Sequence, residues 1–357
     1  MNNIPRCEHP RPDRKRNDWI NLNGTWDFEI DNAMVGVDKK FFLRDSLDMK
    51  ITVPFTAESV LSGIGHTDFM NAVWYRRNID IPAEWAGKRV ILHIDACDYE
   101  TQLYVNGVPY MGTHKGGYTS FQYDITDMLK AEGNYITLYV IDDIRSCKQV
   151  AGKQSQKFGS YGCYYTRTTG IWQTTWLEYV PTDYILSTKY YPDIERSKLV
   201  IEALTVGGEG MTLTAKASYE GKAMGVGTTV VHGGKAVVEV ELDELILWEV
   251  GNGRLYDLEL TMGDDVISSY FGMRKIECRD GFFYLNGKCV FQRLVLDQGF
   301  YPDGIYTAST LSELEADIDR SLAMGFNGAR LHQKVFEPLF LSLCDKKGYI
   351  VWGEHAN

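Results

Sequence analysis

Short strand-like stretches, separated by turn residues, make up the first half of the chain. Arg89–Asp95 is predicted to be a buried strand, Thr101–Val105 is another strand, and Asn134–Val140 alternates between apolar and polar residues. A period of two is typical of strands with one buried face, and Asn106-Gly107 after the second stretch is a hairpin turn signal. No convincing helix interrupts this pattern. We therefore predict an antiparallel β-sandwich of jelly-roll size over residues 1–181.

A second run of predicted strands covers residues 182–276. Its stretches are Lys198–Leu204, Met211–Ala215, Ala236–Val240 and Tyr256–Thr261. This spacing within a short region predicts a small immunoglobulin-like β-sandwich. No Cys–Trp–Cys arrangement is present, so kinship with antibody domains is not implied.

The segment from Arg145 to Gly170 breaks the rhythm of the first sandwich. It is long, polar and rich in Gly, Lys and Gln. Loops of this length in compact domains are often functional. A functional loop and a mobile surface excursion are equally good interpretations at this point.

From Phe283 onward the pattern predicts strands that alternate with helices. The strands are Val290–Leu296, Gly328–Leu331 and Tyr349–Trp352. The first stretch is almost continuously apolar, which is typical of a strand buried on both faces of a parallel sheet. Short links between strands and helices predict a parallel β-α-β-α-β unit.

Local capping signals mark the two helices of this unit. Thr310 and Glu313 have the spacing of a capping box at a helix N-terminus. Gly325 suits the left-handed residue that follows a helix. Pro338 suits the first turn of the second helix, and Gly348 suits its end.

This last unit has the pattern that begins a (β/α)8 barrel, a fold that typically needs about 250 residues. Only residues 277–357 remain for it. We therefore expect an incomplete barrel, as in a truncated reading frame. A complete small α/β domain is the alternative. The predicted fold class is mainly β: a jelly roll and an immunoglobulin-like sandwich, followed by the first three strands of a (β/α)8 TIM barrel.

Charge and composition limit the classes of partner. The formal net charge is -11, which argues against nucleic acid because phosphate binding needs a basic surface. The basic run from Arg11 to Arg16 is interpreted as a solvated arm. No apolar stretch is long enough to span a membrane, so no membrane partner is expected. Association into a homo-oligomer stays open.

The cysteines and the N-terminus bear on location and on metals. The sequence has 7 cysteines and no CxxC pair. An odd number without such spacing indicates reduced thiols, and not a disulfide framework or a zinc site. The N-terminus lacks the apolar core of a secretory signal. We expect a cytoplasmic protein without a cofactor, and no metal site is visible from the spacing of its residues, although metal use stays open.

Six motifs in the same order along the chain resemble glycoside hydrolase family 2, the family of β-galactosidases and β-glucuronidases. They are Trp19–Phe28, Val73–Arg77, the group Val105–Gly107 with Gly116–Phe121 and Tyr123–Thr126, Arg167–Glu178, Phe271–Ile276 and Phe283–Lys288. The resemblance implies a hydrolase that acts on oligosaccharides or glycosides. A non-catalytic, lectin-like carbohydrate-binding protein is the alternative. The choice among galactoside, glucuronide and mannoside stays open.

Barrel geometry selects the candidate substrate-binding residues, because barrel enzymes place their sites at the C-terminal ends of the strands. The candidates are Asp297 with its neighbour Gln298 after the first strand, Arg330 and His332 after the second, and Glu354 and Asn357 after the third. Their side chains donate to or accept from sugar hydroxyls. Each of them, taken alone, also fits an ion pair at the barrel rim or a surface loop.

The sequence departs from the family pattern at two of these strand ends. The family has Asn and His after the first strand, where this chain has Leu296-Asp-Gln298. The His-Tyr-Pro that the family has after the second strand is matched only loosely by His332-Gln-Lys334. Details of the pocket are therefore not carried over from the family.

The resemblance implies retaining hydrolysis with two carboxylates about 5–5.5 Å apart, one an acid and the other a nucleophile. In the family the acid is the Glu of an Asn-Glu pair that ends the fourth strand, and the nucleophile is a Glu on the seventh. This sequence contains no Asn-Glu dipeptide. We expect no catalytic residue in this chain, and we do not assign Glu354 as the acid.

Several residues in the family motifs have a structural interpretation that we favour. Trp26, Trp172 and Trp176 are expected to pack in the sandwich core. Arg167 is expected to be an internal ion-pair partner and not a ligand-binding group.

Overall fold

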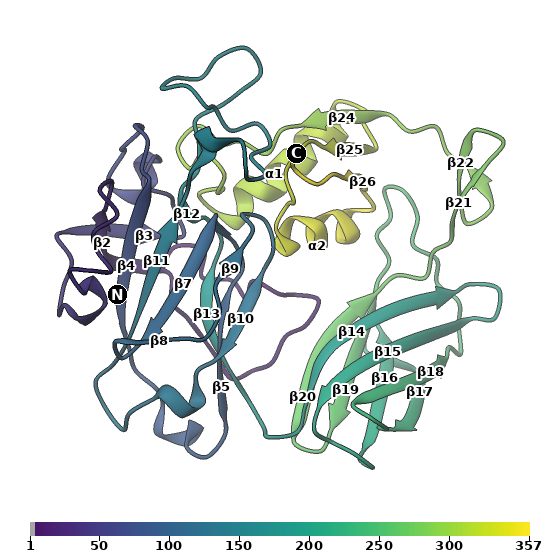
Figure 1. The fold of residues 1–357 in the computed structure, drawn as a ribbon. Helices are drawn as coiled ribbons and strands as arrows, with labels where there is room; N and C mark the ends of the chain where they lie inside the picture. The colour runs from purple at the N-terminus through teal and green to yellow at the C-terminus, as the bar shows by residue number, and fades with distance from the viewer. Residues whose placement is uncertain (1–3) are drawn as a thin grey trace.

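The computed structural model describes residues 4–357 as two β-sandwiches and a parallel sheet carrying two helices. Figure 1 shows the first sandwich on one side, the second sandwich below and to the other side, and the parallel sheet between them at the top. The predicted mainly β fold is confirmed. Neither helix has the length and apolar character that crossing a membrane requires.

Two antiparallel sheets face each other in the first sandwich. One has the order β1-β13-β5-β10, and the other β3-β2-β4-β11-β7-β8 with β9 beside β7. The strands are β1 (Trp19–Asn21), β2 (Gly24–Ile30), β3 (Met49–Val53), β4 (Ala72–Ile79), β5 (Arg89–Ile94), β7 (Glu100–Val105), β8 (Val108–Pro109), β9 (His114–Lys115), β10 (Phe121–Asp124), β11 (Asn134–Ile141) and β13 (Thr175–Val180), with the separate pair β6 (Cys97–Asp98) and β12 (Gly170–Ile171). Short 3-10 helices lie between them: η1 (Phe41–Leu43), η2 (Val60–Ser62), η3 (Ala83–Trp85), η4 (Thr126–Met128) and η5 (Ile144–Ser146).

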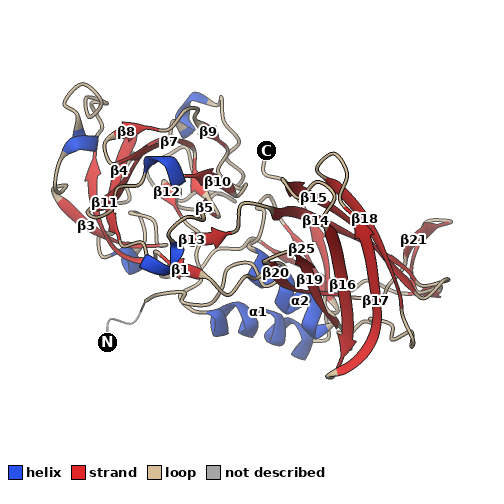
Figure 2. Cartoon of the chain, turned by 90° about the horizontal axis from the view of Figure 1, so that it is seen from below, coloured by secondary structure: helices blue, strands red, loops and turns tan. Residues whose placement is uncertain are grey.

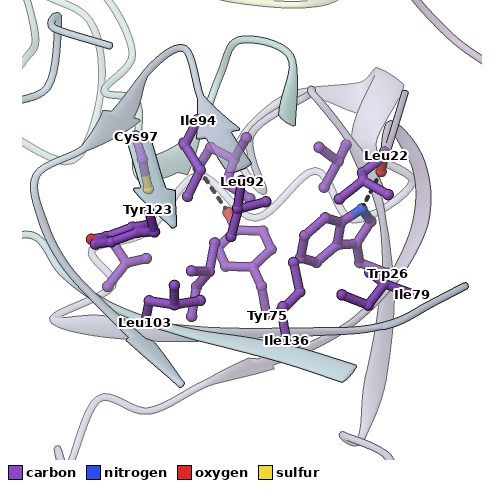
Figure 3. Packing of buried hydrophobic residues seen from close by; sticks show 14 of the residues in the cluster. Leu22, Trp26, Tyr75, Ile79, Leu92, Ile94, Cys97, Leu103, Tyr123 and Ile136 are labelled. Atoms are coloured by element: carbon purple, nitrogen blue, oxygen red, sulfur yellow. Dashed lines mark hydrogen bonds between the residues drawn. The ribbon is translucent and has the colours of Figure 1, made fainter. Parts of the chain in front are cut away.

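Alternation along these strands builds the core of the first sandwich. Ile136 of β11, Leu103 of β7 and Leu92 of β5 point into the space between the sheets, where Trp26 and Tyr75 fill the centre (Figure 3). The predicted hairpin turn is also confirmed, because Asn106 and Gly107 have φ angles of 53° and 80° between β7 and β8. Two positive φ angles are what a two-residue type I′ turn requires.

The second sandwich pairs a sheet of order β14-β15-β18 with one of order β17-β16-β19-β20. Its strands are β14 (Tyr184–Asp193), β15 (Lys198–Val206), β16 (Thr212–Tyr219), β17 (Lys222–Val230), β18 (Lys235–Glu241), β19 (Tyr256–Met262) and β20 (Asp265–Phe271). All four predicted strands are present. Each observed strand extends beyond its predicted end by one or more residues, because pairing with a neighbouring strand continues there.

The C-terminal part begins with a small antiparallel sheet of β21 (Ile276–Arg279), β22 (Phe282–Leu285) and β23 (Lys288–Cys289). The parallel sheet follows, with β24 (Leu294–Asp297), α1 (Leu311–Ala323), β25 (Gly328–Leu331), α2 (Pro338–Lys347) and β26 (Ile350–Gly353). Helices α1 and α2 lie side by side against this sheet (Figure 2). The predicted β-α-β-α-β order is confirmed.

The capping signals worked largely as predicted. The Thr310 side chain accepts a hydrogen bond from the Glu313 amide at 3.2 Å, whereas the Glu313 carboxylate binds Ser309 and not Thr310. Pro338 opens α2, and Gly348 closes it with a φ of 67°. The helix boundaries therefore follow from local chemistry.

The prediction for the first parallel strand was wrong in extent and burial. β24 begins at Leu294 and not at Val290, and none of its residues is fully buried. Leu296 is 49% exposed. The reason is that β24 lies at the edge of the sheet, and the helices cover only one of its faces.

The interpretation of Arg11–Arg16 as a solvated arm was also wrong. Arg16 is 4% exposed and pairs with Glu178 of the first sandwich at 2.9 Å and with Asp265 of the second at 2.6 Å. Lys15 forms a β-bridge with Ser268. The segment therefore links the two sandwiches, a role that no local sequence pattern reveals.

Three tryptophans and Arg167 are buried as predicted, but in different surroundings. Trp26 lies in the core of the first sandwich, whereas Trp172 packs between that sandwich and the C-terminal part. Trp176 stacks on His93 outside the inner core, with ring centroids 3.9 Å apart. Arg167 forms no ion pair within residues 4–357, since its guanidinium donates to backbone carbonyls such as that of Lys157 at 2.8 Å.

Candidate functional site

The parallel sheet has a covered face and an open face. Val295, Ala329 and Val351 lie in one register row and pack toward α1 and α2. Side chains alternate along a strand, so the next row, Leu296, Arg330 and Trp352, points to the opposite face. Trp352 is 49% exposed. An exposed indole next to a guanidinium is well suited to contact a sugar ring.

Arg330 and Glu354 form an ion pair across the ends of β25 and β26. The second carboxylate oxygen of Glu354 accepts from the Gln333 amide at 3.2 Å. Burial raises the pKa of Glu354, but the hydrogen bond and charge of Arg330 outweigh it, so that this pKa lies below its ordinary value. Glu354 is therefore a carboxylate at neutral pH. It can accept from a hydroxyl but has no proton to donate.

His332 lies beside this pair and contacts Gln298. Its Nδ1 is 2.9 Å from the Gln298 side-chain oxygen. Partial burial lowers the pKa of His332. The charge of Glu354 raises this pKa, but the charges of Lys153 and Arg330 lower it, and the result lies below the ordinary value. A neutral imidazole at pH 7 leaves Nε2 as a hydrogen-bond acceptor if Nδ1 donates to Gln298.

Two predicted site residues do not join this group through their side chains. Asp297 lies in register with Leu331 on the helix-covered face, and its Oδ1 accepts from the Gly299 amide at 2.8 Å. Burial raises its pKa. Within residues 4–357, Asn357 takes part through its backbone, since its carbonyl oxygen accepts from the Ala151 and Gly152 amides at 3.3 and 3.0 Å. Asp297 and Arg330 both lie near strand ends, but they belong to neighbouring register rows, so their side chains point to opposite faces of the sheet.

The polar loop of residues 145–170 reaches the strand ends from the first sandwich (Figure 1). A Cβ atom at Gly152 would lie 2.5 Å from the Gln333 carbonyl oxygen, so only glycine permits this close approach. Tyr165 stacks on Phe300, which follows β24, with centroids 4.2 Å apart. The sequence signalled the loop by its length, but Lys153, Tyr165 and Trp352 were missed as site residues.

Buried carboxyl groups hold the base of this loop. Gln154 donates to Asp98 at 2.6 Å, and the Thr169 hydroxyl donates to Asp142 at 2.7 Å. Burial raises the pKa of Asp142 to about 6 and that of Glu58, beside Thr169, to about 8. These acids attach the loop through hydrogen bonds, and none of them forms an ion pair within residues 4–357.

Lys334 fixes the opposite side of the site. Its buried ammonium group donates to the carbonyls of Gly299 and Tyr306 at 2.5 and 2.8 Å. It lies 4.7 Å from the Tyr306 ring centroid and 5.2 Å from that of Trp172. Burial lowers its pKa to about 8. Aromatic faces attract a cation, so Lys334 holds the segment after β24 against the first sandwich.

The described residues, 4–357, contain no group of three or more His, Cys, Asp or Glu side chains placed to hold a metal ion. The polar groups at the strand ends can donate and accept hydrogen bonds. With the exposed indole, they offer donors, acceptors and an apolar face within one region.

Comparison with known proteins shows that the chain is similar to glycosidases. The β-galactosidase of Thermoanaerobacter pseudethanolicus is 27% identical over 303 residues, which cover 80% of this chain and 40% of that protein. The β-glucuronidase of Rattus norvegicus is 24% identical over 383 residues, covering 93% of this chain and 56% of that protein. The chain thus spans less than two thirds of the length of these curated relatives.

Solved structures and a family description agree with these relatives. The apo structure of a β-glucuronidase from Ruminococcus gnavus superimposes with a TM-score of 0.81 at 16% identity, covering 99% of this chain and 61% of that one. At this identity the likeness shows the fold. Residues 20–150 match the sugar binding domain of glycosyl hydrolases family 2. Residues 20–150 therefore resemble that domain, and the predicted resemblance of the chain to glycoside hydrolase family 2 is confirmed.

Proposed function

We propose that the whole protein is a β-glycosidase that cleaves O-glycosidic bonds by the retaining, two-carboxylate mechanism. Relatives named β-galactosidase and β-glucuronidase support the class of reaction. The proposal includes a (β/α)8 barrel that begins with β24, and an acid and a nucleophile carried outside these 357 residues. The match covers only 40% of the first relative, which leaves room for both groups.

In this proposal residues of the chain bind and orient the sugar. The Glu354 carboxylate accepts from a hydroxyl, and Arg330 donates to a neighbouring oxygen. The exposed Trp352 ring covers an apolar face of the pyranose. Lys153 and Tyr165 extend from the loop and limit the site on the side of the first sandwich. The ion pair of Arg330 and Glu354 on the open face of the sheet is the observation that carries this assignment.

Sugar binding by the chain tests the site directly. The indole N–H signals of the 8 tryptophans can be followed in a protein labelled at Trp, and the signal of Trp352 is identified with a Trp352→Phe variant. We expect methyl β-galactoside or methyl β-glucuronide to shift this signal saturably. Glu354→Gln should weaken binding about tenfold or more, since a charge-assisted hydrogen bond contributes about 1.5–3 kcal/mol.

A matched control is Glu259→Gln, which breaks an exposed pair with Lys216 on the second sandwich. It should leave the shift of Trp352 unchanged. No saturable shift with either glycoside, or equal weakening by both variants, would remove Glu354 from the site.

Hydrolysis assays test the catalytic half of the proposal. The 357-residue chain should not hydrolyse nitrophenyl β-glycosides, because the proposal places both carboxylates of the mechanism outside it. Turnover that disappears in Glu354→Gln would make Glu354 catalytic and contradict the proposed roles.

The proposed location is the cytoplasm. All seven cysteines are unpaired, and Cys7, Cys147, Cys163, Cys278 and Cys289 are exposed. Exposed free thiols suit a reducing compartment. Cell fractionation tests this assignment, and recovery of the protein outside the cytoplasm would reject it.

A further inference from the structure

A pocket of about 340 Å³ lies between the two sandwiches, beside the N-terminal segment. Arg14 lines it from that segment, Ser187 from the second sandwich, and His93, Asp95, Gln122 and Trp176 from the first. None of these residues belongs to the group at the ends of the parallel strands. The volume falls in the range of small-molecule sites.

Fixed contacts hold the walls of this pocket. Arg16 joins the sandwiches through Glu178 and Asp265, and it also donates to the Ile185 carbonyl at 2.8 Å. The Ser269 hydroxyl donates to the Asp13 carbonyl at 2.5 Å. The pocket is therefore formed before a ligand arrives, which lowers the entropy lost on binding.

Its floor is a row of side chains on adjacent strands. Gln122 of β10, His93 of β5 and Trp176 of β13 are direct register partners. His93 Nε2 lies 3.0 Å from a Glu178 carboxylate oxygen, and burial lowers the pKa of His93. A neutral imidazole that donates from Nε2 to a carboxylate has Nδ1 free as an acceptor.

Asp95 and Arg14 also line the pocket, and each has a polar atom without a hydrogen-bond partner in the described residues. Asp95 is 5% exposed, and one carboxylate oxygen accepts from the Trp176 indole at 3.2 Å. Its other oxygen has no hydrogen bond within residues 4–357. Arg14 donates to the Ile185 carbonyl at 3.3 Å, and its Nε has no partner in the described part of the chain. Arg11 pairs with Asp13 at 2.7 Å, but Arg14 has no such carboxylate there.

We infer that this pocket is a second carbohydrate site, which takes one pyranose ring of a glycan away from the strand-end site. Neighbouring ring hydroxyls both donate and accept. Arg14 donates to them, and Asp95 and His93 accept from them. His93, Asp95 and Gln122 all fall within residues 20–150, the segment that matches a sugar binding domain. The site does not depend on hydrolysis by the protein.

The indole signal of Trp176 reports on this pocket, because that indole is bonded to Asp95. The same Trp-labelled chain is titrated with methyl β-galactoside and methyl β-glucuronide, and Trp176→Phe identifies the signal. We expect one or both glycosides to shift it saturably. The open-chain polyol glucitol and inorganic phosphate should not. Arg14→Met should weaken binding about tenfold or more.

A second variant and a control separate this site from the proposed function. Gln122→Trp places a larger side chain at an exposed position on β10 and so narrows the pocket. It should abolish the saturable shift of the Trp176 signal, and it tests the site even if Arg14→Met does not fold. Arg330→Met should leave the Trp176 titration unchanged, because it acts only at the strand ends. No saturable shift, an equal shift with glucitol or phosphate, or full binding by Gln122→Trp would overturn the inference.

Discussion

The first sandwich and the parallel sheet place the same kinds of side chain in opposite surroundings. Leu103 in the sandwich is completely buried between two sheets, whereas Leu296 in the parallel sheet is half exposed. Arg16, where the first sandwich meets the second, forms buried ion pairs, whereas Arg330 pairs with Glu354 at the surface. Side chains on a face that another sheet covers stabilise the fold. A sheet covered on one face keeps side chains available for a ligand.

Breaking an ion pair in each region should give the largest contrast. Arg16→Met leaves Glu178 and Asp265 buried without their cation, which should cost about 3–5 kcal/mol of unfolding free energy. Glu354→Gln breaks an exposed pair and should change it by about 1 kcal/mol or less. Urea unfolding of both variants measures the difference. An equal loss would make the strand-end pair structural.

Truncating one leucine in each region sharpens the comparison further. Leu103→Ala opens a cavity in the core and should lose about 2–5 kcal/mol. Leu296→Ala on the open face should lose about 0.5 kcal/mol or less, as for surface changes. A large loss for Leu296→Ala would mean that another surface covers this face in solution.

The stability of the first sandwich should fall with rising pH. Burial raises the pKa of Glu58 from 4.5 to about 8. Between these values the folded protein keeps a proton that the unfolded chain has released, so the unfolding free energy decreases by up to about 1.4 kcal/mol per pH unit. Urea titrations from pH 5 to pH 8 on the wild type and Glu58→Gln measure this contribution. A variant with the same slope as the wild type would exclude Glu58 as its source.

Lys334 should give the C-terminal part a slope of opposite sign. Burial lowers its pKa from 10.5 to about 8. Above pH 8 the folded protein has lost a proton that the unfolded chain keeps, so stability rises by at most about 1.4 kcal/mol per pH unit. The difference in unfolding free energy between the wild type and Lys334→Met, measured from pH 8 to pH 9.5, gives the contribution of Lys334. The contribution of the tyrosines cancels in this difference, because both proteins contain them. A difference that does not change with pH would contradict the assignment.

Local chemistry was enough to predict most elements of the chain. Gly328–Leu331 is a strand with the predicted bounds, and α2 begins at Pro338 and ends before Gly348. The turn at Asn106-Gly107 also has its predicted conformation. Apolar periodicity, caps and turn residues act over a few positions, so they can be read without knowing which segments meet. The candidates Arg330, His332 and Glu354 followed from the same rule, since strand ends are local features.

Contacts between distant segments decided the rest. Asp297 and Arg330 both lie at strand ends, but only their registers put them on opposite faces of the sheet. Lys153 comes from a loop that lies more than a hundred positions before the strand ends in the chain, and the buried acids Asp98 and Asp142 anchor that loop. The run Arg11–Arg16 was predicted to be a solvated arm. In the structure the two sandwiches supply carboxylates for Arg16 and, within residues 4–357, none for Arg14. Burial and ion pairing depend on which residues pack around a side chain, and the local sequence pattern does not specify those neighbours.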